Sequence, residues 1–421
     1  MRFLFVTWGG GGNVPPTLAI ARRLIDRGHL VHVLGTPALQ NAVKAAGCAF
    51  VPYRRVIDGI PLAAGTAGFG RLRAGLLVPE LARSAPSLAF AQDLLAQVSR
   101  TPADALVIDF MLAGAIAAGE RAGLPTAALM HTVYCLPAPG APPFGPAWSH
   151  RSSARRYALH DAAMSTLARA VSRQRLGELN AARRALGLDS VLSASQQLAG
   201  VARVLVLTSN AFDPPLRELP PNVRYVGPQL DNSPRREDVA QSWPDDDPRP
   251  LVVVSFSTRF AAPRVVQRVL DALAALSVRT VLTLGRALST HELRVPAGVT
   301  ARSFLPHAAL LPQTRLVVTH AGLGTVMASL GHGVPLLCMP LKNDQFETAA
   351  RVVAAGAGLR LSWRASRRSV RHAALELLRE PRYTARARRL ADAIAADGPD
   401  RAVDELETLV RPARPLVSGA A

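Results

Sequence analysis

Residues 315–349, RLVVTHAGLGTVMASLGHGVPLLCMPLKNDQFETA, decide the fold of this chain. An apolar run at 316–318 leads into a glycine-spaced turn at 320–324, and an apolar helical stretch follows. A second apolar run ends on a polar cluster at 343–345. The pattern predicts a strand, a helix N-terminus, another strand and a short polar loop. Because a helix start offers free N–H groups and a positive dipole end, we expect it to hold a diphosphate.

Three polar side chains of this segment are candidate ligand contacts. His320 adds a strong hydrogen-bond donor beside the helix start. Asp344 and Gln345 carry the carboxylate and amide groups that usually bind pairs of hydroxyls, so the loop could hold a sugar. Structural roles are the alternatives: His320 could be a strand-end histidine, and Asp344 could only cap a helix that begins near Gln345.

Length and composition bound the class of protein. A chain of 421 residues predicts two domains, and 49% hydrophobic residues with few aromatics favour an α/β protein. No stretch of about 18 uncharged apolar residues predicts a membrane span, and the apolar N-terminal run is too short for a signal peptide. The three cysteines are scattered, which favours a cytoplasmic location over a disulfide framework. They are Cys48, Cys135 and Cys338.

The net charge of +19 is carried almost entirely by arginine, with lysine only at Lys44 and Lys342. The arginines are spread along predicted helices and form no block with interleaved aromatics. The densest stretch, 151–175, alternates with alanine and serine and predicts a solvated helix face. We therefore expect no nucleic-acid partner.

The N-terminal half opens with a βαβ pattern, which predicts a parallel sheet. The expected elements are a strand at 2–8, a turn at Gly9–Gly12, Asn13 as a helix N-cap, a helix at 15–27 and a strand at 30–34. Further strands are predicted at 105–108, 126–130 and 204–207. The proline-rich stretch 136–148 is expected to be a mobile loop over a cleft.

The pattern restarts after a polar, turn-rich segment. It predicts strands at 251–254 and 278–284 and helices at 263–276 and 401–410. The expected organisation is an N-terminal acceptor-binding domain at 1–228, a linker at 229–249, a nucleotide-sugar-binding domain at 250–398, a helix at 399–411 that packs back on the first domain, and a loose tail at 412–421.

Two other motifs predict neither a dinucleotide site nor a metal site. The Gly9–Gly12 run lacks the third glycine of a dinucleotide fingerprint, and no acid follows the second strand. Asp245–Asp247 is flanked by prolines in the predicted linker, so we expect a solvated turn and assign no metal.

As a set, these motifs resemble those of nucleotide-sugar glycosyltransferases with the GT-B fold. The resemblance is to bacterial family 1 enzymes of the macrolide glycosyltransferase type, which decorate antibiotics and other secondary metabolites. It implies an α/β protein with two Rossmann-like parallel-sheet domains that face a central cleft. The motifs that carry it are the glycine-rich opening, VGP at 226, SFST at 255, FLPHAALLP at 304, HAGLGT at 320 and NDQ at 343.

The resemblance also implies roles for single residues. The implied contacts to the donor's phosphates, base, ribose and sugar are Ser257, Thr258, Phe304, Leu305, His320, Gly322, Gly324, Thr325, Asp344 and Gln345. The implied acceptor-binding residues are Gly12, Asn13 and His131. The sequence departs from the family at position 257, where glycine is more common, and at Thr348, where asparagine is common.

The sequence departs most from the family at the residue that accepts the proton. An inverting transfer needs a base that takes the acceptor's proton, and the family places a histidine just after the first glycine loop. Asn13 stands there and cannot act as a base. Asp109, which follows a predicted strand, is the predicted base, although it could instead cap the next helix. His131 is a second possible base.

Three interpretations stay open: Asp109 acts directly, the acceptor is a carbon or nitrogen nucleophile, or the protein is a catalytically impaired sugar-nucleotide-binding or auxiliary protein. A nucleotide-sugar epimerase is less favoured. We predict an inverting glycosyltransferase that uses a TDP- or UDP-sugar as co-substrate, needs no cofactor, and acts on a small apolar or aromatic acceptor. We expect no integral membrane association and a monomer or homodimer.

Overall fold

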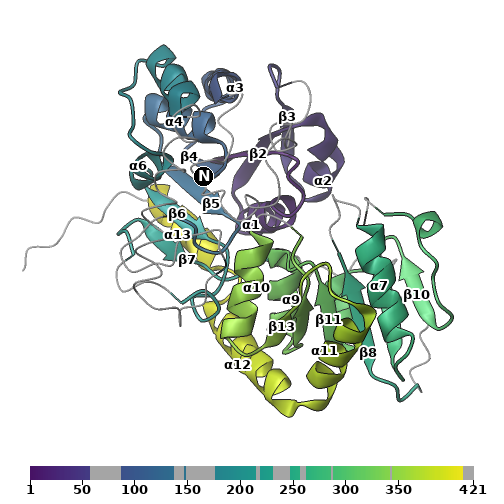
Figure 1. Cartoon of the computed structure of the whole chain (residues 1–421). Helices are drawn as coiled ribbons and strands as arrows, with labels where there is room; N and C mark the ends of the chain where they lie inside the picture. The colour runs from purple at the N-terminus through teal and green to yellow at the C-terminus, as the bar shows by residue number, and fades with distance from the viewer. Residues whose placement is uncertain are drawn as a thin grey trace, which may run out of the picture.

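The computed structural model describes residues 1–56, 87–136, 147, 176–214, 219–230, 247–256, 262–285, 288–341 and 344–410. These residues form two α/β domains, each built around one parallel sheet (Figure 1). The predicted fold class, two Rossmann-like parallel-sheet domains, is confirmed.

The first domain contains a seven-stranded sheet in the order β3-β2-β1-β4-β5-β6-β7. Its strands are β1 (Arg2–Val6), β2 (Leu30–Gly35), β3 (Ala49–Pro52), β4 (Ala105–Asp109), β5 (Thr126–Met130), β6 (Arg203–Val206) and β7 (Val223–Tyr225). The central strands are apolar on both faces, as expected for a parallel sheet covered by helices. The helices are α1 (Val14–Asp26), α2 (Gln40–Ala45), α3 (Ser87–Arg100), α4 (Ala113–Ala122) and α6 (Ala194–Ala199), with a short 3-10 turn, η1 (Pro37–Leu39).

The second domain contains a six-stranded sheet in the order β10-β9-β8-β11-β12-β13. Its strands are β8 (Leu251–Ser255), β9 (Arg279–Thr283), β10 (Val299–Arg302), β11 (Thr314–Thr319), β12 (Leu336–Cys338) and β13 (Gly358–Arg360). Its helices are α7 (Pro263–Leu273), η3 (Thr290–Glu292), α8 (His307–Leu310), η4 (Leu311–Gln313), α9 (Leu323–Gly331), α10 (Gln345–Ala354), α11 (Arg367–Arg379) and α12 (Pro381–Asp397).

The two strand orders place one switch point in each sheet. In the first sheet β1 lies between β2 and β4, and in the second β8 lies between β9 and β11. Connections leave in opposite directions at such a point, so a crevice opens at the carboxyl ends of the two strands, where ligands of α/β proteins bind. The topology alone therefore marks the ends of β1 and β4, and those of β8 and β11, as binding places.

The last described helix, α13 (Arg401–Val410), packs on the first domain (Figure 1). Its Ala402, Val403 and Leu406 belong to the same buried cluster as residues of β1 and α1. Ion pairs fasten its polar side, with 2.6 Å between Arg27 and Asp404 and 2.9 Å between His29 and Glu407.

The two segments where the chain passes between the domains, after β7 and at the end of α12, are in contact with each other. Gly227, which follows β7, has φ +71°, and a Cβ added there would lie 2.8 Å from the Cβ of Asp397 at the end of α12. A side chain at position 227 would thus be strained by the backbone and by this close approach. The glycine of the VGP motif is explained by this contact.

The domain interface is apolar at its centre. Val133 and Phe212 of the first domain are at most 1% exposed and belong to the buried cluster of the second domain, with residues of α9 and α12. The Thr208 hydroxyl donates to Met327 Sδ of α9 at 3.1 Å. The ends of β5 and β6 are therefore packed directly on the second domain.

Most predicted elements are confirmed to within a few residues at their ends. The strand expected at 2–8 ends at Val6, and the helix expected at 263–276 ends at Leu273. The second apolar run within residues 315–349 spans 334–339, but only 336–338 form a strand, and Val334 and Met339 flank it. Most of the linker (231–246), most of the proline-rich loop (137–146 and 148), the arginine-rich stretch 151–175 and the tail lie outside the described residues.

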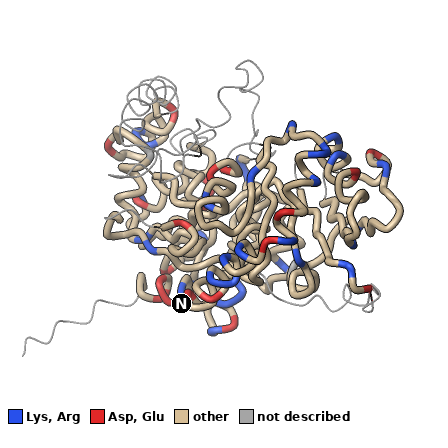
Figure 2. Tube along the Cα trace, turned by 60° about the horizontal axis from the view of Figure 1, so that its bottom comes forward, with Lys and Arg blue, Asp and Glu red and all other residues tan. Residues whose placement is uncertain are grey.

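Basic and acidic residues are interspersed along the described trace (Figure 2). Within the described ranges, no helix has the length and apolar character needed to cross a membrane.

Candidate functional site

Asn13 and Asp109 meet at the switch point of the first sheet. The amide nitrogen of Asn13 lies 2.8 Å from Asp109 Oδ2, 2.9 Å from the carbonyl oxygen of Trp8 and 3.3 Å from the Thr7 hydroxyl. Both residues are buried, at 2% exposure each. Because the nitrogen faces three acceptors, the network itself defines the orientation of the amide.

The amide oxygen of Asn13 points away from these partners. It is buried and has no hydrogen-bond partner among the described residues. A Cβ added to Gly10 would lie 2.5 Å from this oxygen, so the glycine loop can pass it only without a side chain. Asn13 occupies the N-cap position of α1 as predicted, but its side chain makes no capping hydrogen bond. It is bound to Asp109 instead.

Both oxygens of Asp109 are already engaged. Oδ2 accepts from Asn13, and Oδ1 accepts from the backbone N–H of Met111 at 3.0 Å. The alternative role as N-cap of the next helix is wrong, because α4 begins at Ala113 with Leu112 in the cap position. Asp109 instead closes a turn directly after its own strand. Its role as the base stays a prediction.

His131 lies beside this pair. It directly follows β5, which is paired with β4 so that Asp109 is opposite Leu129. Its Nδ1 is 3.7 Å from Asp109 Oδ2, and its ring lies edge-on to Phe110 with 5.3 Å between the centroids. Asn13, Asp109 and His131 therefore form one row along the edge of the first sheet.

The second switch point carries the predicted donor loop. After β11 the chain passes through His320, Ala321 and Gly322, and α9 begins at Leu323 with no side-chain cap on its N-terminus. The first N–H groups of such a helix have no partner within the helix. Ala321 is fully buried and has φ +67°, a left-handed conformation that is rare for a residue with a Cβ. Strain of this kind gathers at ligand-binding turns.

His320 is held between the two strands of the switch point. Its ring stacks on Phe256, with centroids 6.2 Å apart, and it bonds to the backbone of Ser255. Burial lowers the pKa of His320 to about 4, although the Ser255 hydrogen bond opposes the shift. At neutral pH and without a ligand this imidazole is therefore uncharged.

Two glycines shape the space around His320. A Cβ added to Gly322 would lie 2.8 Å from His320 Nε2, so glycine is needed there to admit the ring. At Gly324 an added Cβ meets nothing within 4 Å, so this position faces open space in the first turn of α9, next to Thr325. The implied contacts Ser257 and Thr258 lie outside the described residues.

The remaining implied donor contacts differ in their surroundings. Phe304 is 56% exposed, whereas Leu305 is 7% exposed and its side chain belongs to the buried core. Gln345 Oε1 accepts from the backbone N–H of Leu341 at 2.9 Å, which stabilises the polar loop from within. Gly12 is exposed on the opposite side of the interface.

Asp344 occupies the N-cap position of α10 and makes no side-chain capping bond. The alternative that Asp344 serves only as a helix cap is therefore not supported. Burial raises its pKa, and the charge of nearby His131 partly offsets this shift. An electrostatic interaction thus connects the donor loop of the second domain to the row on the first sheet.

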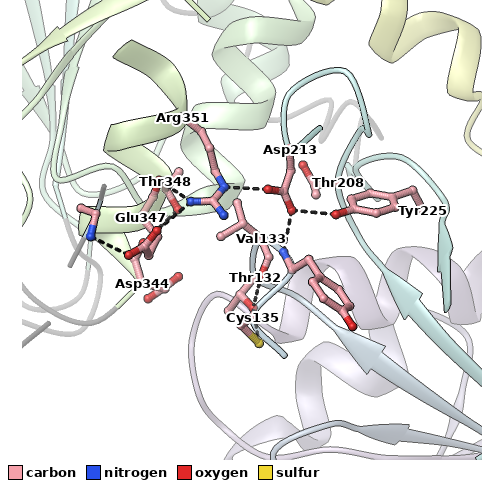
Figure 3. A network of polar contacts seen from close by, with 12 residues as sticks. Thr132, Val133, Cys135, Thr208, Asp213, Tyr225, Asp344, Glu347, Thr348 and Arg351 are labelled. Carbon is pink, nitrogen blue, oxygen red and sulfur yellow. Dashed lines mark hydrogen bonds and ion pairs between the residues drawn. The ribbon is translucent and has the colours of Figure 1, made fainter. Parts of the chain in front are cut away.

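An ion network that the sequence reasoning missed joins the two domains (Figure 3). Arg351 of α10 donates to Asp213 Oδ1 at 2.6 Å and to Glu347 Oε2 at 2.7 Å. Asp213, which follows β6, also accepts from the backbone N–H of Tyr134 at 2.6 Å and the hydroxyl of Tyr225 at 2.9 Å. Burial opposes the charge of Arg351, but the two carboxylates raise its pKa.

The network also reaches the proline-rich segment. Glu347 Oε1 accepts from the backbone N–H of Ala147 at 2.7 Å. The three charged residues are at most 7% exposed. The signal in the sequence was the pair Glu347 and Arg351, four residues apart on the buried face of a helix, where unpaired charges are rarely found.

Comparison with known proteins agrees with this arrangement. Residues 267–409 match the family model of the erythromycin biosynthesis protein CIII-like C-terminal domain. The chain is 33% identical over 424 residues to 4'-demethylrebeccamycin synthase of Lentzea aerocolonigenes, covering 97% of this chain and 99% of the relative.

Two solved structures show the same fold. The glycotransferase of kitacinnamycin has a TM-score of 0.77 at 21% identity, over 98% of this chain and 99% of the other. The spinosyn rhamnosyltransferase complexed with thymidine diphosphate has a TM-score of 0.70 at 19% identity, over 97% of this chain and 100% of the other. The full-length match in sequence and these likenesses in fold show that the chain belongs to the GT-B glycosyltransferases of antibiotic and secondary-metabolite biosynthesis.

Proposed function

We propose that this enzyme is an inverting glycosyltransferase that moves a sugar from a TDP- or UDP-sugar to a small apolar or aromatic secondary metabolite. The bond it forms joins the anomeric carbon to an oxygen, nitrogen or carbon atom of the acceptor. Proton removal depends on Asp109. The cysteines of the described chain are buried and unpaired, which suits the reducing cytoplasm.

One observation carries this proposal: the switch points of the two sheets bear complementary groups. The second sheet presents His320 and the uncapped N-terminus of α9, which suit a diphosphate leaving group. The first sheet presents Asn13, Asp109 and His131. Asp344 interacts electrostatically with His131 across the interface, so a sugar bound at the donor loop would lie beside the first-domain row.

Thymidine diphosphate is the first nucleotide to test, because the spinosyn rhamnosyltransferase binds it in a structure of the same fold. The donor-binding domain should hold the nucleotide, and the first domain, with its proline-rich segment, the acceptor.

A nucleotide diphosphate should stabilise the folded enzyme. A ligand at 100 times its Kd adds about 2.7 kcal/mol to the free energy of unfolding, which raises the melting temperature by roughly 5–10 °C for a domain of this size. Thermal unfolding with TDP, UDP and adenosine diphosphate measures the effect and ranks the bases. If none of these nucleotides shifts the unfolding curve, the proposed donor site is wrong.

Turnover separates the enzyme from an auxiliary sugar-nucleotide-binding protein. Incubation with TDP-glucose or UDP-glucose and a panel of phenols, indoles and aromatic polyketides should release the nucleotide diphosphate and form a β-linked product from an α-linked donor. Stabilisation without any product would favour the auxiliary role. A product with the donor's own anomeric configuration would contradict inversion.

His320→Ala should weaken nucleotide diphosphate binding by roughly 10- to 150-fold, because a hydrogen bond to a charged group contributes about 1.5–3 kcal/mol. Calorimetric titration with TDP or UDP measures the change. His332→Ala is the matched control: His332 lies at the other end of the same helix, where its Nδ1 is 2.8 Å from the carbonyl oxygen of Ala328. Equal affinities for the wild type and His320→Ala would remove His320 from the donor site.

A further inference from the structure

We infer that His131 takes the acceptor's proton and that Asp109 acts through it. The inference rests on the proposed glycosyl transfer and assigns a catalytic residue to it. Its basis is the geometry of the row at the edge of the first sheet, where each of the three side chains has different access to the interface.

Asn13 and Asp109 are poorly suited to contact the reacting atom of the acceptor. An amide has no basic site, so Asn13 cannot take a proton. The Asp109 side chain is 1% exposed, and its two oxygens accept hydrogen bonds from Asn13 and Met111. Because the Asp109 carboxylate is buried beneath these neighbours, direct attack on a proton would require it to reach past them.

The His131 side chain has the access that Asp109 lacks. It is 15% exposed, and because Nδ1 is buried, the exposed area belongs to the other atoms of the side chain. Nδ1 has no hydrogen-bond partner among the described residues and lies 3.7 Å from Asp109 Oδ2. A carboxylate beside this nitrogen favours the tautomer with the proton on Nδ1. Nε2 is then the basic atom.

The separation of 3.7 Å exceeds a hydrogen bond. Hydrogen bonds of catalytic groups are often long without substrate and shorten in the complex. A small rotation of the His131 ring brings Nδ1–H onto Asp109, which then stabilises the imidazolium as it forms. Asp344, at the start of α10, interacts electrostatically with His131 from the donor side.

The reaction balances on these groups. The acceptor's heteroatom forms a bond to the anomeric carbon, and the bond from that carbon to the β-phosphate oxygen breaks. The electron pair leaves with the nucleotide diphosphate. The proton of the acceptor's O–H or N–H passes to Nε2 of His131 and from there to solvent, which restores the neutral imidazole.

His131→Gln tests the inference with a matched pair of acceptors. Dichlorophenol keeps most of its proton near neutral pH and needs a base, whereas the thiophenol with the same ring substituents is already ionised. With TDP-glucose or UDP-glucose, His131→Gln should lower kcat for the phenol by roughly 10²- to 10⁴-fold. Its kcat for the thiophenol should stay within about threefold of the wild type, and its stabilisation by TDP should be unchanged.

Two further readouts exclude a purely structural effect. Raising the pH through the ionisation of the phenol should narrow the difference in phenol rate between the wild type and His131→Gln, because the phenolate needs no base. Added imidazole should restore part of the phenol rate in His131→Ala. His29→Gln is the control, because His29 precedes β2 at the opposite edge of the sheet.

The outcomes separate the two proposals. If the wild type transfers glucose and His131→Gln keeps the full phenol rate, the inference is wrong and the proposed function stands. An equal loss for phenol and thiophenol would also overturn it, because the variant would then have lost positioning rather than a base. If the wild type transfers glucose to no acceptor in the panel, the proposed function itself fails and the inference with it.

Discussion

Replacing Asp109 by Asn is expected to lower kcat by roughly 10²- to 10⁴-fold, the usual contribution of a positioned proton acceptor. The substitution removes the negative charge that a forming imidazolium at His131 or a departing proton requires. It also puts an amide nitrogen in place of one carboxylate oxygen, against the N–H of either Asn13 or the Met111 backbone, which now donate to Asp109. Steady-state rates with any acceptor that the wild type glycosylates measure the loss.

The control for Asp109→Asn is Asp104→Asn. Asp104 is exposed and directly precedes the strand that ends at Asp109. It accepts from the backbone N–H of Arg2, so it lies at the opposite end of the strands from Asp109. We expect Asp104→Asn to leave kcat unchanged. Both variants should keep the thermal shift expected with TDP, because the proposed donor site lies on the other domain. A fully active Asp109→Asn enzyme would remove Asp109 from proton transfer, directly or through His131.

Asp109→Asn and His131→Gln together test how the two residues act. If Asp109 works only through His131, the double variant should be about as slow as the slower single variant, since residues that act as a unit are non-additive. If Asp109 is itself the base, His131→Gln should leave most of the phenol rate, and the effects of the two changes should multiply.

The local structure of the proposed donor half could be predicted from the sequence because its signals are local. His320, Gly322, Gly324 and the strand before them lie within a few residues, and each has a physical reason that acts over that distance. Glycine at 322 admits the histidine ring, and the helix start follows immediately. The strands could also be predicted from local sequence, since buried parallel strands are short apolar runs.

The acceptor half depends on contacts between distant residues. Asn13 and Asp109 are 96 positions apart, and Asp213 and Arg351 are 138 apart. Local reasoning placed Asn13 at an N-cap, which is its position, and assumed a capping bond, which is absent. Its side chain follows the stronger attraction of a buried carboxylate. Only the strand order brings β1, β4 and β5 together, and so shows that His131 lies beside Asp109.

The second large effect is expected for Arg351→Met. Methionine fits the volume of the arginine stem but leaves Asp213 and Glu347 as buried carboxylates without a cation. Removing one partner of a buried ion pair typically costs about 3–5 kcal/mol of stability, which lowers the melting temperature of a domain of this size by roughly 6–20 °C. The matched control is Arg371→Met, since Arg371 is exposed on α11 and should change stability by at most about 0.5 kcal/mol.

Charge, and not packing, is the reason for that loss, and a neutral network should show it. In the triple variant Arg351→Met, Glu347→Gln and Asp213→Asn no buried charge is left unpaired, so we expect it to recover part of the stability lost by Arg351→Met. A triple variant less stable than Arg351→Met would mean that the network stabilises mainly through hydrogen bonds to Tyr134, Tyr225 and Ala147.

The same network should govern turnover, because it joins the elements that carry the reacting groups. Asp213 binds the backbone three residues after His131, and Arg351 lies on the helix that begins directly after Asp344. A displacement of 1 Å between reacting groups can cost about 10²-fold in rate. At a temperature where Arg351→Met is still folded, kcat should therefore fall by roughly this factor while the affinity for TDP changes little. Equal losses in kcat and in nucleotide affinity would instead place the damage within the second domain, and the network would be a stabilising contact without a positioning role.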